Sequence, residues 1–196
     1  MDKNWILQLA EDIEERHGSE VRDKIFGDVD LVCDDHESIS AWFDNFVIGM
    51  DELNDREFLS SMMAKHCPCR YTEAEEDIKK IFEETNTLEE FVARLDENGI
   101  FSDSVKLSGN VLYATKQPFS VYGKHNHSGR YSEKCHCDLA SHTERPISDI
   151  FCHCCTVGYY EKMFKNALGV DVKVEFVDSV IKGGTGCAAA IYLPEK

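Results

Sequence analysis

Apolar side chains in the first hundred residues recur at intervals of three and four, which is the period of an amphipathic helix. In the first such stretch one face carries Trp5, Ile6, Leu9 and Ile13, and Gly18 is the expected stop. The same pattern predicts further helices over SISAWFDNFVIGM, residues 55–65, TEAEEDIKKIFEET and TLEEFVARLDENG. Residues 1–100 are therefore predicted to be helical.

Several residues predict where these helices begin and end. Ser38 or Ser40 would cap the helix that contains SISAWFDNFVIGM. Capping boxes, in which Thr or Ser is followed by Glu three positions later, open the last two helices at Thr72 and Thr87. Gly99 then provides a C-terminal stop.

After residue 100 the period changes to two. The stretch VKLSGNVLYA predicts a β-hairpin that turns at Ser108, Gly109 and Asn110. Residues 116–148 show little periodicity, so we expect a long loop, and a loop of that length in a compact domain is usually functional.

The C-terminal part reads as a helix, a strand, a tight turn and a second strand. The helix has one apolar face, formed by Val157, Tyr160, Phe164, Ala167 and Leu168, and ends at Gly169. Strands follow over 172–181 and over CAAAIYLP, with KGGTG between them. The predicted fold class is α+β, with a helical part (1–100) and a mixed part (101–196) whose C-terminal helix and antiparallel hairpin pack on a small sheet. The two parts are expected to form one continuous domain.

Charge changes this picture by excluding some partners. The formal net charge is −16, and residues 1–100 contain 27 acidic but only 10 basic side chains. Such an acidic chain lacks the electrostatic footprint for nucleic acid or an anionic membrane, so neither is expected as a partner. The N-terminus turns acidic too soon for a secretory signal, and no apolar run has the length of a membrane span, so a cytoplasmic protein is expected.

The cysteines are the main candidates for chemistry. A reduced compartment disfavours a disulfide framework for the nine cysteines, so metal or catalytic roles gain weight. Three Cys-x-Cys doublets recur, and in an extended segment both sulfurs of a doublet point to the same side. Two doublets would supply the four ligands of a tetrahedral zinc site. The candidate metal ligands are Cys67, Cys69, Cys135, Cys137, Cys152 and Cys154.

Other interpretations of these residues remain open at this stage. Buried free cysteines are common in cores, and four thiolates also suit an iron-sulfur cluster. Cys155 would lie at the front of a helix that begins near Thr156, where the helix N-terminus would lower its thiol pKa and make it a candidate nucleophile. Asp138 and His127 are the candidate groups for moving protons near a metal-bound water.

The C-terminal stretch FCHCCTVGYYEKMFKNALGVDVKVEFVDSVIKGGTGCAAAIYLP resembles the ending of the L-2-amino-thiazoline-4-carboxylic acid hydrolase-like family, and more distantly the 4-vinyl reductase type of small-molecule-binding domain. In both, a cysteine-containing segment leads into a helix, an alternating strand, a Gly-rich turn and a cysteine, here Cys187, that opens the last strand. The resemblance implies a small-molecule cavity between helices and a curved sheet, with zinc ligated by cysteines near the helix and hairpin. Ser179 stands where that pattern would place a further cysteine.

These observations predict a zinc site beside a small pocket. The leading hypothesis is a hydrolase in which metal-bound water attacks a C=N or amide-type carbon of a small substrate. A second hypothesis is a non-catalytic module that binds a small-molecule ligand and has a structural zinc. A third is a thiol-redox or iron-sulfur protein. The identity of the small molecule and the oligomeric state are left open by the sequence.

Overall fold

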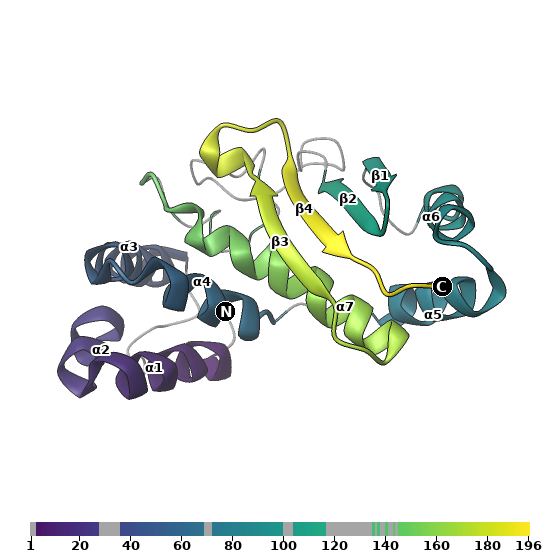
Figure 1. The fold of residues 1–196 in the computed structure, drawn as a ribbon. Helices are drawn as coiled ribbons and strands as arrows, with labels where there is room; N and C mark the ends of the chain where they lie inside the picture. The colour runs from purple at the N-terminus through teal and green to yellow at the C-terminus, as the bar shows by residue number, and fades with distance from the viewer. Residues whose placement is uncertain are drawn as a thin grey trace.

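The computed structural model describes residues 3–27, 36–68, 72–99, 104–116, 135, 137, 140, 143 and 145–196. Its helices are α1 (Lys3–His17), α2 (Ser19–Phe26), α3 (His36–Leu53), α4 (Arg56–Lys65), α5 (Thr72–Glu84), α6 (Leu88–Glu97) and α7 (Tyr159–Leu168). Its strands are β1 (Ser104–Ser108), β2 (Val111–Lys116), β3 (Lys173–Asp178) and β4 (Cys187–Tyr192). The predicted α+β class is confirmed, with helices gathered around one antiparallel sheet (Figure 1).

The sheet has the strand order β1-β2-β4-β3, and each neighbouring pair is antiparallel. The expected hairpin is present, because Ser108 pairs with Val111 around Gly109 and Asn110. In the next pair Lys116 lies directly opposite Cys187. The register shifts between Phe176 and Asp178, and β3 ends at Asp178, earlier than the alternation predicts.

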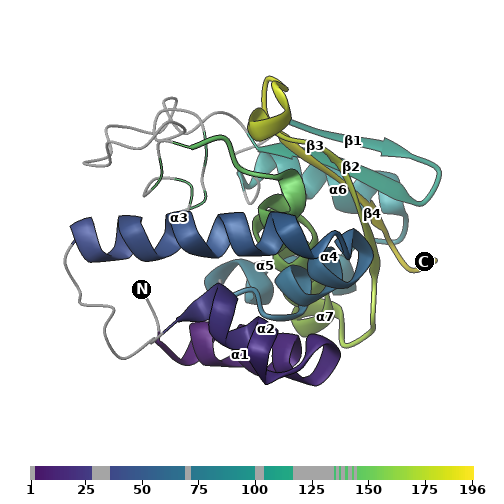
Figure 2. The same ribbon diagram turned by 90° about the vertical axis from the view of Figure 1, so that its left-hand side faces the viewer.

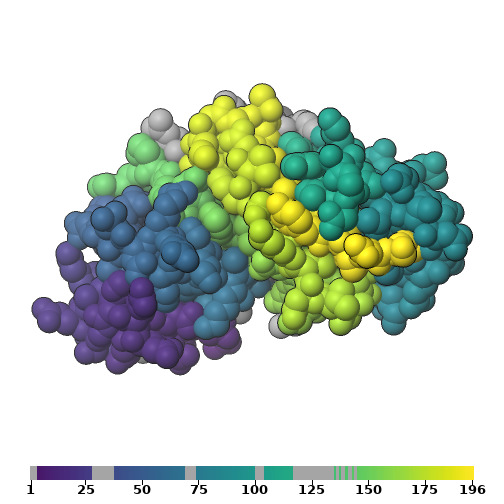
Figure 3. Space-filling model, in the orientation of Figure 1, coloured from purple at the N-terminus to yellow at the C-terminus, as the bar shows by residue number. Residues whose placement is uncertain are grey.

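Two hydrophobic clusters build the interior. The first is formed mainly by α1 to α4 and includes most of the buried cysteines, and the second joins α5, α6 and α7 to the inner face of the sheet. Tyr159, at the start of α7, packs against both clusters. Figure 2 shows α3 and α4 beside the helical run that leads into α7, and Figure 3 shows α1 and α2 (purple) at the far side of the molecule from the sheet (yellow and teal).

Several helix ends follow the sequence rules and others do not. The Thr87 hydroxyl accepts from the Glu90 amide (3.2 Å), and the Glu90 carboxylate accepts from the Asn86 amide (3.0 Å). The predicted cap at Ser38 or Ser40 is wrong because α3 already begins at His36. The sequence pattern also missed α2, which follows α1 after Gly18. The side chain of Thr72 lies outside the described residues.

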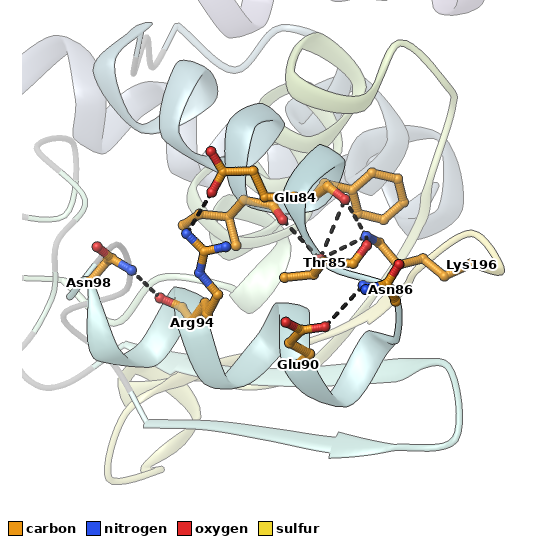
Figure 4. Close-up of polar contacts among 9 residues, drawn as sticks. Glu84, Thr85, Asn86, Glu90, Arg94, Asn98 and Lys196 are labelled. Atoms are coloured by element: carbon orange, nitrogen blue, oxygen red, sulfur yellow. Dashed lines mark hydrogen bonds and ion pairs between the residues drawn. The ribbon is translucent and has the colours of Figure 1, made fainter.

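The turn between α5 and α6 is held by polar contacts from both helices and from the end of the chain (Figure 4). Arg94 binds Glu84 (2.8 Å), and the Lys196 ammonium donates to the Thr85 hydroxyl (2.7 Å) and to the carbonyl oxygens of Phe82 and Thr85. A cation at a helix C-terminus satisfies carbonyls that have no partner within the helix. These contacts hold α6 and the end of the chain against α5, and α6 also packs against β1 at the edge of the sheet.

No helix in the described part of the chain is both long enough and apolar enough to cross a membrane.

Candidate functional site

The helical segment that enters α7 carries Cys152, Cys154 and Cys155. Ser148 caps its start, since its hydroxyl accepts from the Ile150 amide (3.3 Å). A 3-10 turn, η4 (Asp149–Phe151), leads through Cys152 and His153 into a π-helical segment, η5 (Cys154–Gly158), and then into α7. Single π turns inside helices occur frequently at functional sites.

This geometry corrects two expectations about the CHCC stretch. The expected extended doublet is wrong, because Cys152 and His153 both have right-handed helical backbone angles. Residues two apart on a helix point to nearly opposite sides, whereas residues three apart lie on neighbouring sides. Cys152 therefore shares a side with Cys155 rather than with Cys154. The placement of Cys155 at a helix N-terminus is also wrong, since the helical segment begins at Asp149.

Five cysteines from three segments lie within electrostatic range of at least one other member beside this helical segment, and we call them the thiol cluster. The side chains of Cys135 and Cys187 are hydrogen-bonding partners, and Cys137 and Cys155 also act on Cys135 electrostatically. Cys152 is close enough to feel both Cys187 and Cys137. Every member is at most 8% exposed. The cluster consists of Cys135, Cys137, Cys152, Cys155 and Cys187, whose side chains are thiols and not disulfides.

The thiols differ in how easily they lose a proton. The hydrogen bond with Cys187 and burial raise the pKa of Cys135, and the same bond lowers the pKa of Cys187. Burial raises the pKa of Cys152, although a hydrogen bond from the Ser179 hydroxyl acts in the opposite direction.

Lys116 is a buried cation beside the cluster. It is 9% exposed, its ammonium donates to the Cys155 carbonyl oxygen (2.6 Å), and it lies 3.6 Å from the centre of the Tyr159 ring. Sequence reasoning missed this residue. The signal that could have found it is the alternation in VLYATK, which places Lys116 on the same buried face as Leu112 and Ala114.

Ser179 also belongs to the surroundings of the cluster. It is fully buried, and its hydroxyl contacts Cys152 and accepts from the Lys182 amide (3.3 Å). The position at which the family resemblance suggests a further cysteine therefore lies beside the thiols in this fold.

Two groups of contacts fix the segments that carry the thiols. Thr143, which is 1% exposed, hydrogen bonds to Asp44 on α3 and accepts from the Arg145 amide (3.0 Å). Asp149 forms ion pairs with Arg56 of α4 (2.6 Å) and with Lys182 (3.8 Å), which follows β3. These contacts tie the loop and the start of the helical segment to α3, α4 and the sheet.

The remaining predicted site residues lie elsewhere or outside the described residues. Cys67 is buried just after α4, and its carbonyl oxygen accepts from Lys162 (3.3 Å), which is seven residues beyond Cys155. Cys154 is buried, but the helical backbone turns it away from Cys152. Cys69, His127 and Asp138 lie outside the described residues.

His153, between two cysteines, stacks on Phe176 with ring centres 5.0 Å apart, and burial lowers its pKa. Both side chains line a shallow cavity of about 700 Å³ between α4 and β3. The other lining residues are Arg56, Glu57, Ser60, Val157, Val174 and Glu175, so no thiol of the cluster faces this cavity.

The thiol cluster suits a metal ion through the type of its donor atoms more than through their present spacing. Within the described ranges, no three side chains of His, Cys, Asp or Glu already have the spacing of a metal-ligand set. The donors that do come together are thiols, which as thiolates favour zinc, copper(I) and iron-sulfur clusters over magnesium or calcium. A metal site here would need the sulfurs to close around the ion.

Residues 119–196 match the model of a family of unknown function (DUF6144). This region contains all five cysteines of the thiol cluster, whereas Lys116 and Cys67 precede it. No curated protein matches the chain.

Proposed function

We propose that this protein binds one thiophilic metal ion, zinc in the first place, through its thiol cluster. The observation that carries the proposal is the convergence of five buried thiols from three segments: the loop that precedes α7, the helical segment that leads into α7, and the start of β4. Four thiolates form a complete zinc site, so the cluster holds more than enough ligands.

The contact between Cys135 and Cys187 is compatible with two ligands of one zinc ion. Two ligands of a tetrahedral Zn–S site with bonds of about 2.3 Å are separated by about 3.8 Å, which is also the range of a thiol–thiol hydrogen bond. Cys135, Cys137, Cys155 and Cys187 do lie in the first hydrophobic cluster, as core cysteines would. The feature that favours a metal site is that Ser179 and Lys116 are buried beside them.

The proposed ligands are Cys135, Cys137, Cys152 and Cys187, and Cys155 is the fifth thiol. The Cys155 thiol lies 3.8 Å from the Cys152 carbonyl oxygen, within the helical segment, and its own carbonyl oxygen accepts from Lys116. These contacts indicate that Cys155 helps to hold the helical segment in place. They do not favour Cys155 as the nucleophile that the sequence suggested.

Burial favours a structural ion over a catalytic one. A catalytic zinc keeps one position open to water and substrate, whereas a structural zinc has four protein ligands. The thiols are almost completely buried, and the cavity beside His153 and Phe176 is not lined by any of them. We therefore favour a small-molecule-binding module with a structural zinc over the hydrolase, and this cavity is the proposed place for the ligand.

Metal analysis of protein purified without added metal tests the proposal. The expected result is about one zinc per chain with no visible absorbance. A brown protein that contains iron and acid-labile sulfide would indicate that the site holds an iron-sulfur cluster instead of zinc. Metal-free protein that gains no stability and binds no zinc when zinc is added would contradict the proposal.

A further inference from the structure

Lys116 lies in an environment that is costly for a charged group. Its side chain is only 9% exposed, and a buried ammonium is unfavourable unless an anion or several dipoles compensate it. Its partners within the described part of the chain are the Cys155 carbonyl oxygen (2.6 Å) and the rings of Tyr159 (3.6 Å) and Tyr160 (5.2 Å). Each of these attracts a cation, but none carries a formal charge.

Among the residues that the structure describes, the carboxylates near the cluster, Asp149 and Asp178, are bound to other groups. Asp149 pairs with Arg56 and Lys182, and the Asp178 carboxylate accepts from the Ser179 amide (2.8 Å). The group directly across the sheet from Lys116 is Cys187. Within the described ranges, the group near this ammonium that can become an anion is therefore the Cys187 sulfur, on which the charge of Lys116 already acts.

Metal binding would create that partner. A divalent ion held by four thiolates carries a net charge of −2, and a buried site of that charge is unfavourable without a nearby cation. An ammonium that is already fixed by a carbonyl oxygen and two aromatic rings needs little reorganisation to compensate it.

We propose that Lys116 is the charge-balancing residue of the thiol cluster, a positioning residue whose buried ammonium offsets the negative charge of the metal-thiolate site. This inference rests on the proposed metal-binding function. It adds that the affinity of the site depends on a residue outside the cysteine pattern.

Replacement of Lys116 by methionine tests the role, because methionine has a similar length and no charge. Lys106→Met is the matched control, since Lys106 lies on β1 and is exposed. The measurements are the zinc dissociation constant, from competition with a chromophoric chelator, and the melting temperature of each protein without metal. We expect Lys116→Met to weaken zinc binding at least tenfold, Lys116→Arg to recover part of the loss, and Lys106→Met to bind as the wild type does.

The metal-free proteins separate a charge effect from a packing effect. Removal of a buried charge without an anionic partner should leave the metal-free Lys116→Met protein at least as stable as the wild type. Equal zinc affinity of Lys116→Met and Lys106→Met would overturn the inference. So would a parallel loss of stability and affinity in Lys116→Met that Lys116→Arg does not relieve. If the wild type binds no zinc, the proposed function itself fails.

Discussion

Cys187 shows most clearly how single residues define the site. It opens β4, it contacts Cys135, and it lies opposite Lys116 in the sheet. The doublet pattern did not identify it as a ligand, because it stands alone in the sequence and reaches the cluster only through strand pairing. Cys154 is the converse case, since it belongs to a doublet but the helical backbone turns it away from Cys152.

Separate replacement of these two cysteines tests whether the Cys-x-Cys doublets or the positions of the thiols in the fold identify the metal ligands. Cys187→Ala is expected to reduce bound zinc to well below one equivalent and to weaken retention of the remainder, because it removes one of four thiolate ligands. Cys154→Ala, the matched control, should keep the wild-type zinc content. Metal analysis after gel filtration provides the measurement, and a loss of zinc in Cys154→Ala alone would show that the doublet pattern was the better guide.

At the scale of elements, the position of the helical segment depends on how closely α4 approaches it. A side-chain Cβ placed on Gly158 would lie 2.1 Å from the Ala64 carbonyl oxygen, and backbone atoms cannot yield as a flexible side chain can. Gly158 ends the π-helical segment that carries Cys154 and Cys155. The close approach of α4 therefore fixes the segment that presents Cys152 and Cys155 to the other thiols.

Gly158→Ala is expected to lower the free energy of unfolding by about 1–3 kcal/mol or more, as for other overpacked sites. The exposed Glu76→Ala on α5 is the control and should change stability little. Urea unfolding followed by circular dichroism gives both values. Wild-type stability of Gly158→Ala would show that α4 and the helical segment are not in such close contact.

The sequence predicted most of the elements but not how they place the thiols. Hydrophobic periodicity found α1, α6 and the hairpins because amphipathic patterns reflect which face is buried. It missed α2, which is short and polar, and it could not foresee a π-helical segment where an extended doublet was expected. Backbone conformation in a short cysteine-rich stretch is set by tertiary packing, here against Ala64, and local residue types do not determine it.

At the scale of the whole molecule, ion pairs between segments distant in sequence hold α1 to the end of α4. Asp12 on α1 binds Lys65 at the end of α4 and the following residue, His66, each at 2.9 Å. Burial acts to raise the pKa of Asp12, but the hydrogen bonds and charges of Lys65 and His66 outweigh it and the pKa is lowered. A carboxyl with a lowered pKa stabilises the fold above its ordinary pKa, and this contribution disappears as the pH falls through the pKa of the folded state.

Asp12→Asn should therefore be less stable than the wild type at pH 7, and the difference should shrink as the pH falls below about 4. Urea unfolding at several pH values between 7 and 3 measures the difference. The control is Glu11→Gln, an exposed neighbour on α1, whose stability should follow that of the wild type. A difference between Asp12→Asn and wild type that is constant over this range would contradict the assigned role of the carboxylate.

The same scale explains why a metal ion would matter to the fold as a whole. The loop segment with Cys135 and Cys137, the helical segment with Cys152 and the start of β4 are distant in sequence and meet at the thiol cluster. An ion there would link the helical cluster of α1–α4 to the sheet, close to Tyr159, which packs on both. Metal removal should therefore loosen both halves together.

X-ray absorption at the zinc edge of the purified protein tests the central claim most directly. For the wild type, the predicted result is four sulfur atoms at about 2.3 Å from the zinc ion. For Cys187→Ala, we expect fewer sulfur ligands, with a lighter atom in place of the missing one. A zinc ion surrounded by nitrogen and oxygen ligands, or four sulfurs that persist unchanged in Cys187→Ala, would contradict the thiol cluster as the metal site.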